Sequence, residues 1–313
     1  MTDIDKHIIE LLKCNTSLKD ISVYTNLSCK QIYIRLKNII KKGYQIKPFY
    51  HYDGNINYKL INGFSNLKGD YRIQIPKEEN IFKFLVISDM HLTNKKENLF
   101  YIDNIYNYAV KNDIHTILNL GDLIEGTYTT DANKDMDINV QIEYVIKKYP
   151  YDKSIINYIL YGNHDYHSLH MDGINIATAI ENARYDLVSL GYGDCNLNLK
   201  EEIISLNHKL CLIENKTNDG NSKICLVGHG HEMKTKFFDN LVICVPSLSD
   251  VSPDKTRKIV PGALEIELDF KKSKIRYILI KHLLVYPNVI ECSQVRERFD
   301  DNNKIKVKNY KNS

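Results

Sequence analysis

The sequence predicts a layered α/β domain preceded by a small helical domain. From residue 81 onward, apolar strand-like runs alternate with stretches of helical periodicity, which is the pattern of an α/β domain with buried strands. Residues 1–60 instead have the pattern of three short helices and a hairpin. We therefore expect the α/β domain at 81–285, a linker or short bridging element at 61–80, and a basic tail at 286–313.

Size and composition are those of a globular protein. The chain has 313 residues, of which 43% are hydrophobic and 26% charged. No apolar run approaches the roughly 18 residues that a membrane span needs, and the first residues carry charges where a signal peptide would be apolar. The seven cysteines form no CxxC pair, which argues against a disulfide framework and favours a reducing compartment. We expect a cytoplasmic protein with no membrane partner, and the sequence leaves its oligomeric state open.

The expected N-terminal domain begins with two helices. Ile4, Ile8 and Leu12 share one helical stripe. Ser17 opens the second helix, because Asp20 follows it at the spacing of a capping box.

A third helix and a hairpin complete this domain. The helix begins at Ser28, repeats apolar residues at Ile32, Leu36 and Ile39, and ends at Gly43. The residues that follow alternate around the sequence DGN, a strong hairpin signal. Three helices followed by a hairpin resemble a winged helix-turn-helix domain, whose third helix lies in a DNA major groove. That resemblance implies DNA contacts from Lys30, Gln31, Tyr33, Arg35 and Lys37.

The distribution of charge is compatible with two uses of this domain. Residues 1–60 hold ten Lys and Arg residues against five acids, a balance of +5, whereas the whole chain has a net charge of +3. A basic domain of this kind suits DNA as a partner. The alternative is a module for dimerisation or protein docking, in which the lysines form a solvated face.

Metal-capable side chains follow five of the strand-like runs in the second part of the chain. The carboxyl ends of parallel strands are where ligands collect in an α/β sheet. Carboxylate, imidazole and amide ligands suit Mn, Fe or Zn better than a thiolate metal. The candidates are Asp89 and His91, Asp122, Asn163 with His164 and Asp165, His208, and His229 with His231.

In this order, the motifs DMH, GDLIEG, GNHD, a single His and GHGH resemble the calcineurin-like metallophosphoesterase superfamily. The resemblance covers roughly residues 82–285 and implies a four-layer α/β/β/α sandwich that hydrolyses phosphomonoesters, phosphodiesters or nucleic acids. It also implies two divalent metal ions, commonly Mn, Fe, Zn or Ni. The implied ligands are Asp89, His91 and His231 for one ion, Asp122 as the bridge, and Asn163, His208 and His229 for the other.

The expected chemistry assigns roles to the remaining polar residues. Two metal ions about 4 Å apart would bind a phosphate and activate water for attack on phosphorus. His164 would protonate the leaving oxygen, with Asp165 holding its orientation. Glu125 either supports a metal ligand or caps a helix, and Arg184 is expected in an ion pair on a helix surface rather than on a phosphate.

Some alternatives remain open from the sequence. His208 could instead be a solvated residue in a hairpin turn, with His167 and His170 as its rivals on a loop beside the site. The favoured function is hydrolysis of a phosphodiester, with nucleic acid as one candidate substrate. The alternatives are a DNA-binding regulator that senses a nucleotide, and a small-molecule phosphatase with a helical assembly domain.

Overall fold

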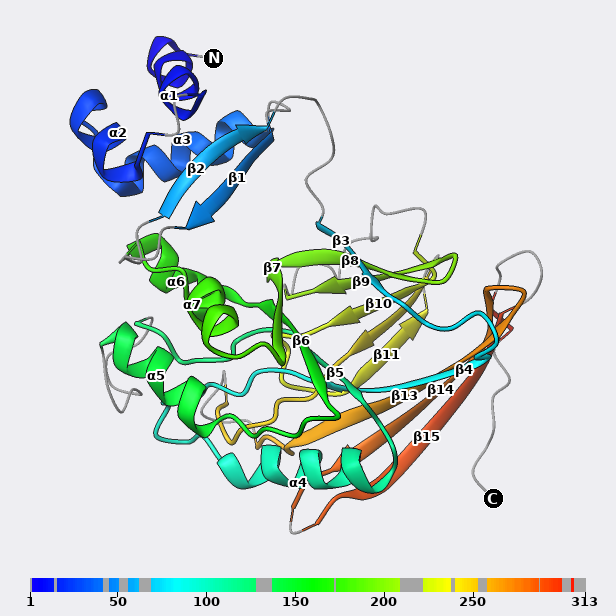
Figure 1. Ribbon diagram of the computed structural model, residues 1–313. Coiled ribbons are helices and arrows are strands. Elements are labelled where there is room, and N and C mark those ends of the chain that lie inside the picture. Colours follow the sequence, from blue (N-terminus) through cyan, green and yellow to red (C-terminus); the bar gives the residue numbers. More distant parts are fainter. Residues whose placement is uncertain are drawn as a thin grey trace.

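The computed structural model places a small N-terminal domain beside a larger two-sheet domain (Figure 1). The residues that it describes are 2–13, 16–41, 45–50, 56–61, 69–127, 137–171, 173–208, 222–237, 240–252, 258–286, 288–299 and 305–306. No described helix has the length and apolar character needed to cross a membrane.

The N-terminal domain has the predicted order of elements. Ser17 caps the second helix by accepting a hydrogen bond from the Asp20 amide, and Asn26 ends that helix with a left-handed φ of 52°. The last two elements are antiparallel strands, while the DGN turn predicted between them and Gly43 lie outside the described residues. The elements are α1 (Asp3–Lys13), α2 (Leu18–Thr25), α3 (Cys29–Lys41), β1 (Gln45–Tyr50) and β2 (Ile56–Ile61).

The apolar stripes of the three helices form a common core. Leu12, Ile21, Ile32 and Leu36 are buried together in it. Burial of one such side chain contributes roughly 1.5–3 kcal/mol, so this core is sufficient to hold three short helices together. One residue of the larger domain, Leu169, belongs to the same cluster.

An eight-stranded mixed sheet forms the centre of the larger domain. Its spatial order is β16, β15, β14, β13, β4, β5, β6, β7. The neighbours from β4 to β7 are parallel, and the remaining neighbours are antiparallel. The strands are β4 (Ile81–Ile87), β5 (Thr116–Asn119), β6 (Ile156–Tyr161), β7 (Leu187–Tyr192), β13 (Gly262–Lys271), β14 (Lys274–Leu284), β15 (Ile290–Phe299) and β16 (Ile305–Lys306).

A six-stranded sheet packs on one face of the first. Its spatial order is β11, β12, β10, β9, β8, β3. Apolar residues of both sheets, among them Phe84, Leu118, Leu206 and Leu226, are fully buried in one cluster. The strands are β3 (Gly69–Ile73), β8 (Asp194–Leu199), β9 (Glu202–Asn207), β10 (Ile224–Val227), β11 (Lys234–Phe237) and β12 (Leu241–Cys244).

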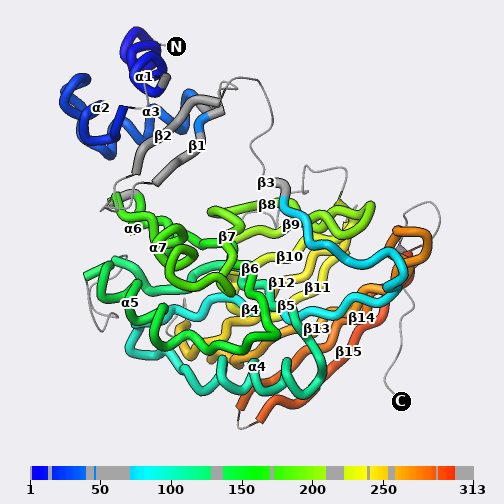
Figure 2. The backbone as a smooth tube through the Cα atoms, in the orientation of Figure 1, coloured from blue at the N-terminus to red at the C-terminus, as the bar shows by residue number. Residues whose placement is uncertain are grey.

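Helices cover the other face of the eight-stranded sheet (Figure 2). Ile105, Val145 and Ile180 lie in a second buried cluster with the strand residues Leu85 and Ile117. The described residues thus form three layers of the predicted sandwich, namely one layer of helices and two packed sheets. The helices of this domain are α4 (Leu99–Lys111), α5 (Ile138–Lys148), α6 (Asn163–Met171) and α7 (Ile176–Ala183).

Two predicted boundaries are wrong. The expected linker at 61–80 contains β3, which pairs in parallel with β8 at the edge of the six-stranded sheet. The expected tail at 286–313 contains β15, which pairs with β14 and extends the other sheet. Most side chains of β15 are exposed, so no apolar run in the sequence indicates a strand there. Its backbone nevertheless pairs with the backbone of the long strand β14.

Helix α7 ends at Ala183, and Arg184 lies between it and β7. The Arg184 guanidinium donates hydrogen bonds to the carbonyl oxygens of Ile146, Tyr149 and Pro150 at 2.9–3.1 Å. It also pairs with the buried Asp186 at 2.7 Å, which confirms an ion pair rather than a phosphate contact for this arginine. These contacts anchor the C-terminal end of α5 to the start of β7.

Arg184→Ala is expected to lower the free energy of unfolding by about 3 kcal/mol, because it leaves the buried Asp186 carboxylate without its cation. Urea denaturation of the full chain measures this change. Lys147→Ala is the matched control, since it removes an exposed ion pair with Glu143 and should change stability by no more than about 0.5 kcal/mol. Equal effects of the two substitutions would contradict this role for Arg184.

Candidate metal centre

Five segments meet at the carboxyl ends of the strands and bring the predicted ligands together. Asp89 and His91 follow β4, Asp122 follows β5, and Asn163, the first residue of α6, is separated from β6 only by Gly162. In the other sheet, His208 follows β9, while His229 and His231 follow β10. Both sheets therefore contribute to one site.

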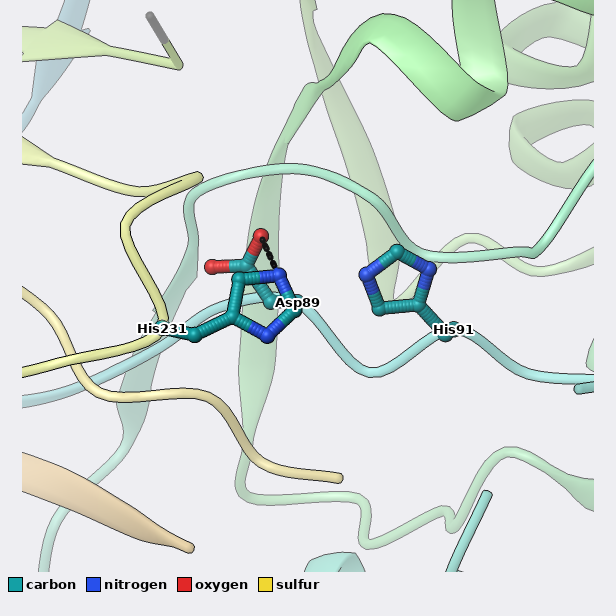
Figure 3. Close-up of side chains that lie close together, drawn as sticks. All are labelled: Asp89, His91 and His231. Carbon is teal, nitrogen blue, oxygen red and sulfur yellow. Dashed lines mark ion pairs between the residues drawn. The ribbon is translucent and has the colours of Figure 1, made fainter. Parts of the chain in front are cut away.

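The first group of ligand atoms belongs to Asp89, His91 and His231, whose side chains are all buried (Figure 3). Nε2 of His231 lies 3.4 Å from Oδ1 of Asp89, and the three ligand atoms lie within 4.8 Å of one another. One divalent ion can be held by atoms so placed.

The second group centres on Asp122. Its Oδ2 lies 3.0 Å from Nε2 of His208 and 3.9 Å from Nδ1 of His229. The same oxygen lies 3.9 Å from Nε2 of His91, a residue of the first group. Asp122 therefore stands between the two groups, as a bridging ligand must.

The donor atoms fit divalent metal ions. Buried polar atoms normally have a hydrogen-bond partner, and each exception needs an explanation. Several of the exceptions gather at this site, and their carboxylate, imidazole and amide groups suit Mn, Fe or Zn rather than a thiolate metal. Among the described residues, the buried atoms of this site without a hydrogen-bond partner are Asp89 Oδ1, His91 Nε2, Asn163 Oδ1, His208 Nε2 and His229 Nδ1.

The opposite nitrogen of each of three ligand rings is fixed by a hydrogen bond. Nδ1 of His91 pairs with the Glu125 carboxylate at 2.9 Å, and Nδ1 of His231 with the Val251 carbonyl at 2.8 Å. Nδ1 of His208 contacts the Leu120 carbonyl. Such bonds orient a ring and leave Nε2 for a metal. Of the two roles considered for Glu125, support of a ligand is therefore the one observed.

Sequence analysis did not identify Ser247 and Ser249. Both are fully buried, and their hydroxyl groups donate hydrogen bonds to the Asp89 carbonyl oxygen at 2.9 and 2.8 Å. They hold the loop that carries Asp89 and His91. They lie in the segment that follows β12, as the predicted ligands follow other strands, and this position was the available signal in the sequence.

The backbone at the ligands is strained. Non-glycine residues rarely have positive φ angles, and each instance costs about 1–3 kcal/mol. Five ligand residues nevertheless adopt them, at angles between 47° and 69°. Strain of this kind persists only where surrounding structure enforces it. The residues are Asp89, His91, Asp122, His229 and His231.

Three motif glycines make room for His208. A Cβ atom on Gly121 would lie 2.4 Å from its Nδ1, and one on Gly228 would lie 2.9 Å from the same atom. A Cβ on Gly162 would lie 2.6 Å from its Nε2 and 2.2 Å from Oδ1 of Asp122. His208 is thus buried at the centre of the site, so the alternative of a solvated turn is wrong.

The rival histidines lie elsewhere. His167 lies in helix α6, not on a loop as expected, and its Nδ1 is 3.2 Å from the hydroxyl of Thr127. His170 also lies in α6, and its side chain is outside the described part. The GNHD motif leads into a helix, because Gly162 follows β6 and Asn163 begins α6.

The expected role of Asp165 is wrong. Its carboxylate accepts hydrogen bonds from the backbone amides of Gly162, Leu123 and Ile124 at 2.7–3.1 Å, so it clamps the loop that follows Asp122. His164 is oriented differently, since its Nδ1 lies 2.9 Å from the Glu125 carbonyl oxygen and its backbone amide donates to Asp122.

Burial and charge act against each other at the histidines. Burial lowers the pKa of His164 and of His231 below the usual value, in spite of neighbouring carboxylates. At His208 burial also lowers the pKa, but the charge of Asp122 outweighs it and raises the pKa to about 9. At Asp122 burial favours the neutral acid, yet His208 holds the pKa well below its usual range.

Most of the proposed DNA contacts are engaged within the chain. Arg35 pairs with the buried Asp5 at 2.8 Å, and the Gln31 side chain accepts a hydrogen bond from the Ser28 amide. The ring of Tyr33 and the ammonium group of Lys37 both contact the Tyr166 ring in α6. Lys30 is exposed. DNA recognition by α3 stays a prediction.

Comparison with known proteins identifies the family. The model of the calcineurin-like phosphoesterases matches residues 82–243, more than half of the chain. The chain belongs to this family. The family expected from the motifs is therefore confirmed. No curated protein matches the chain.

Solved structures similar to this chain include wild-type Vps29 of Entamoeba histolytica complexed with Zn²⁺. The two sequences are 14% identical and the TM-score is 0.43. The match covers 69% of this chain and 99% of Vps29. An archaeal phosphodiesterase is 14% identical, with a TM-score of 0.39 and coverage of 64% and 99%. Yfce, a phosphoesterase from E. coli, is 15% identical, with a TM-score of 0.40 and coverage of 68% and 98%.

Gly162→Ala is expected to weaken Mn²⁺ binding to the phosphoesterase by about tenfold or more, because its new methyl group displaces the side chains of Asp122 and His208. Isothermal titration calorimetry measures the affinity, with circular dichroism as a check of folding. Gly230→Ala is the matched control, because a Cβ atom there meets nothing within 4 Å. Unchanged affinity in the folded Gly162→Ala variant would show that this packing is not required.

Proposed function

We propose that this family member is a dinuclear-metal-dependent phosphoesterase that hydrolyses a phosphodiester. One observation carries the proposal: buried nitrogen and oxygen atoms from four separate segments, without hydrogen-bond partners among the described residues, converge around Asp122. Such a cluster is costly unless a cation occupies it.

The residues divide naturally between two ions. Asp89, His91 and His231 would hold one, and Asn163, His208 and His229 the other, with Asp122 shared. Bound divalent ions supply Lewis-acid charge to a phosphate and lower the pKa of a water molecule. Manganese is the ion we propose to test first, with Fe, Zn and Ni as alternatives.

His164 is the proposed acid for the leaving oxygen. Because its Nδ1 faces the Glu125 carbonyl, Nδ1 carries a hydrogen and Nε2 is the atom that can accept or deliver a proton. Its lowered pKa keeps the ring mostly neutral near pH 7, so it gives up a proton readily once protonated. Asp165 contributes indirectly, by fixing the loop that carries Asp122.

A nucleic acid is one proposed substrate class, supported by the charge balance of residues 1–60. The interpretation of the N-terminal domain as a winged helix that binds DNA is part of the same proposal. The regulator that only senses a nucleotide is less favoured, because a sensor would be free to lose His164 or a ligand, whereas this chain has the full set. We further propose a cytoplasmic setting, because the seven cysteines of the sequence form no CxxC pair.

Two substitutions test this function through hydrolysis of bis-p-nitrophenyl phosphate in the presence of Mn²⁺. His164→Ala should lower kcat by about 100-fold or more, the usual contribution of a positioned acid, and leave metal binding intact. Asp122→Ala should remove activity together with Mn²⁺ binding, because both groups of ligands lose their shared oxygen.

His115→Ala is the matched control for these variants, since this exposed histidine lies at the opposite ends of the same strands. It should retain wild-type kcat. Wild-type protein that binds Mn²⁺ yet hydrolyses neither this diester nor p-nitrophenyl phosphate would refute catalysis and favour the sensor.

A further inference from the structure

The N-terminal domain contacts the phosphoesterase domain through α3 and α6. Figure 1 shows α6 at the side of the larger domain that faces the N-terminal domain. The ring of Tyr33 in α3 lies 5.6 Å from the ring of Tyr166 in α6. Nζ of Lys37 lies 5.1 Å from the first ring and 5.2 Å from the second, so one cation faces both. Leu169, one turn further along α6, is buried with the core of the N-terminal domain.

The aromatic contacts continue from α6 into the sheet. Tyr166 lies 5.6 Å from Tyr192 of β7, and Tyr192 lies 5.2 Å from Tyr161 of β6. The Tyr192 hydroxyl donates to Asn175 at 3.1 Å, which fixes this ring in turn. Four tyrosine rings thus connect α3 with the end of the strand that leads into the site.

Tyr161 and Tyr166 bracket the segment 162–165. Every residue of this segment has a task at the site: Gly162 packs against Asp122 and His208, and Asn163 presents an unpartnered buried oxygen. The His164 amide donates a hydrogen bond to the Asp122 carboxylate, and the Asp165 carboxylate accepts hydrogen bonds from the loop that follows Asp122. A shift of α6 would therefore move the metal ligands and the proposed acid together.

We propose that Tyr33 of α3 is a positioning residue for the segment 162–165, acting through Tyr166, so that the N-terminal domain forms part of the active-site architecture. The predicted consequence for turnover rests on the proposed function, whereas the mechanical contact does not. On α3, Tyr33 and Lys37 contact the Tyr166 ring, so a partner that binds these two residues would compete with that contact.

The test compares four full-length proteins: wild type, Tyr33→Ala, Tyr33→Phe and Tyr24→Ala. Tyr33→Ala removes the ring contact, whereas Tyr33→Phe keeps the aromatic ring and loses only the hydroxyl group. Tyr24→Ala is the control, because this tyrosine of the same domain is 65% exposed. Hydrogen exchange of the amides at 163–171, Mn²⁺ affinity, and kcat and KM for bis-p-nitrophenyl phosphate are measured for each.

We expect Tyr33→Ala to accelerate exchange in α6 and to lower kcat by about fivefold at an unchanged KM, the fold-change equivalent of one aromatic contact. Tyr33→Phe and Tyr24→Ala should match the wild type. Lys37→Ala, at an exposed position, should give a smaller change in the same direction, and it replaces Tyr33→Ala if that variant does not fold.

Unchanged exchange in α6 of folded Tyr33→Ala would overturn the proposal, as would equal effects of the Phe and Ala substitutions. Faster exchange in α6 together with a catalytically inactive wild type would uphold the contact and refute the proposed function instead. A fivefold lower kcat with unaltered exchange in α6 would refute positioning through this helix.

Discussion

The centre of this molecule depends on a single buried carboxylate. Oδ2 of Asp122 lies within 4 Å of imidazole nitrogens from His91, His208 and His229. An ionised carboxylate that is excluded from water must be compensated by nearby cations and hydrogen bonds. Three loops therefore approach this carboxylate. Only glycine fits at Gly121, Gly162 and Gly228, because a Cβ atom there would meet His208 or Asp122. The histidines compensate part of the carboxylate's charge. The site's nitrogen and oxygen atoms that have no hydrogen-bond partner suit divalent ions as ligands.

Such a site is unfavourable by itself and relies on the rest of the fold. Positive φ angles at five ligand residues cost about 1–3 kcal/mol each, and the apolar clusters between the sheets and under the helices offset this strain. The loops are then fixed by individual contacts: Asp165 binds the amides after Asp122, and the two serines Ser247 and Ser249 bind the Asp89 carbonyl. The proposed brace through Tyr33 and Tyr166 would extend this support to the N-terminal domain.

The sequence predicts the family, the order of most elements and the convergence of the ligands, because apolar runs that end in Asp, His and Asn are local patterns. Roles that depend on long-range packing could not be predicted. Asp165 follows His164 in the chain, yet it binds amides from another loop. β15 is recognisable only through its pairing with β14, since its side chains are mostly exposed. The engagement of Tyr33 with Tyr166 joins residues far apart in sequence, so helical periodicity reveals nothing of it.

The most direct test of the shared role of Asp122 is the number of Mn²⁺ ions bound per chain, measured by isothermal titration calorimetry with metal analysis of the loaded protein. The wild type should bind two ions. His231→Ala should weaken one site and Asp122→Asn both, because Asp122 is the ligand that we propose the two ions share. A wild type that binds no ion, or an Asp122→Asn variant that keeps two sites of wild-type affinity, would contradict a dinuclear centre built on this carboxylate.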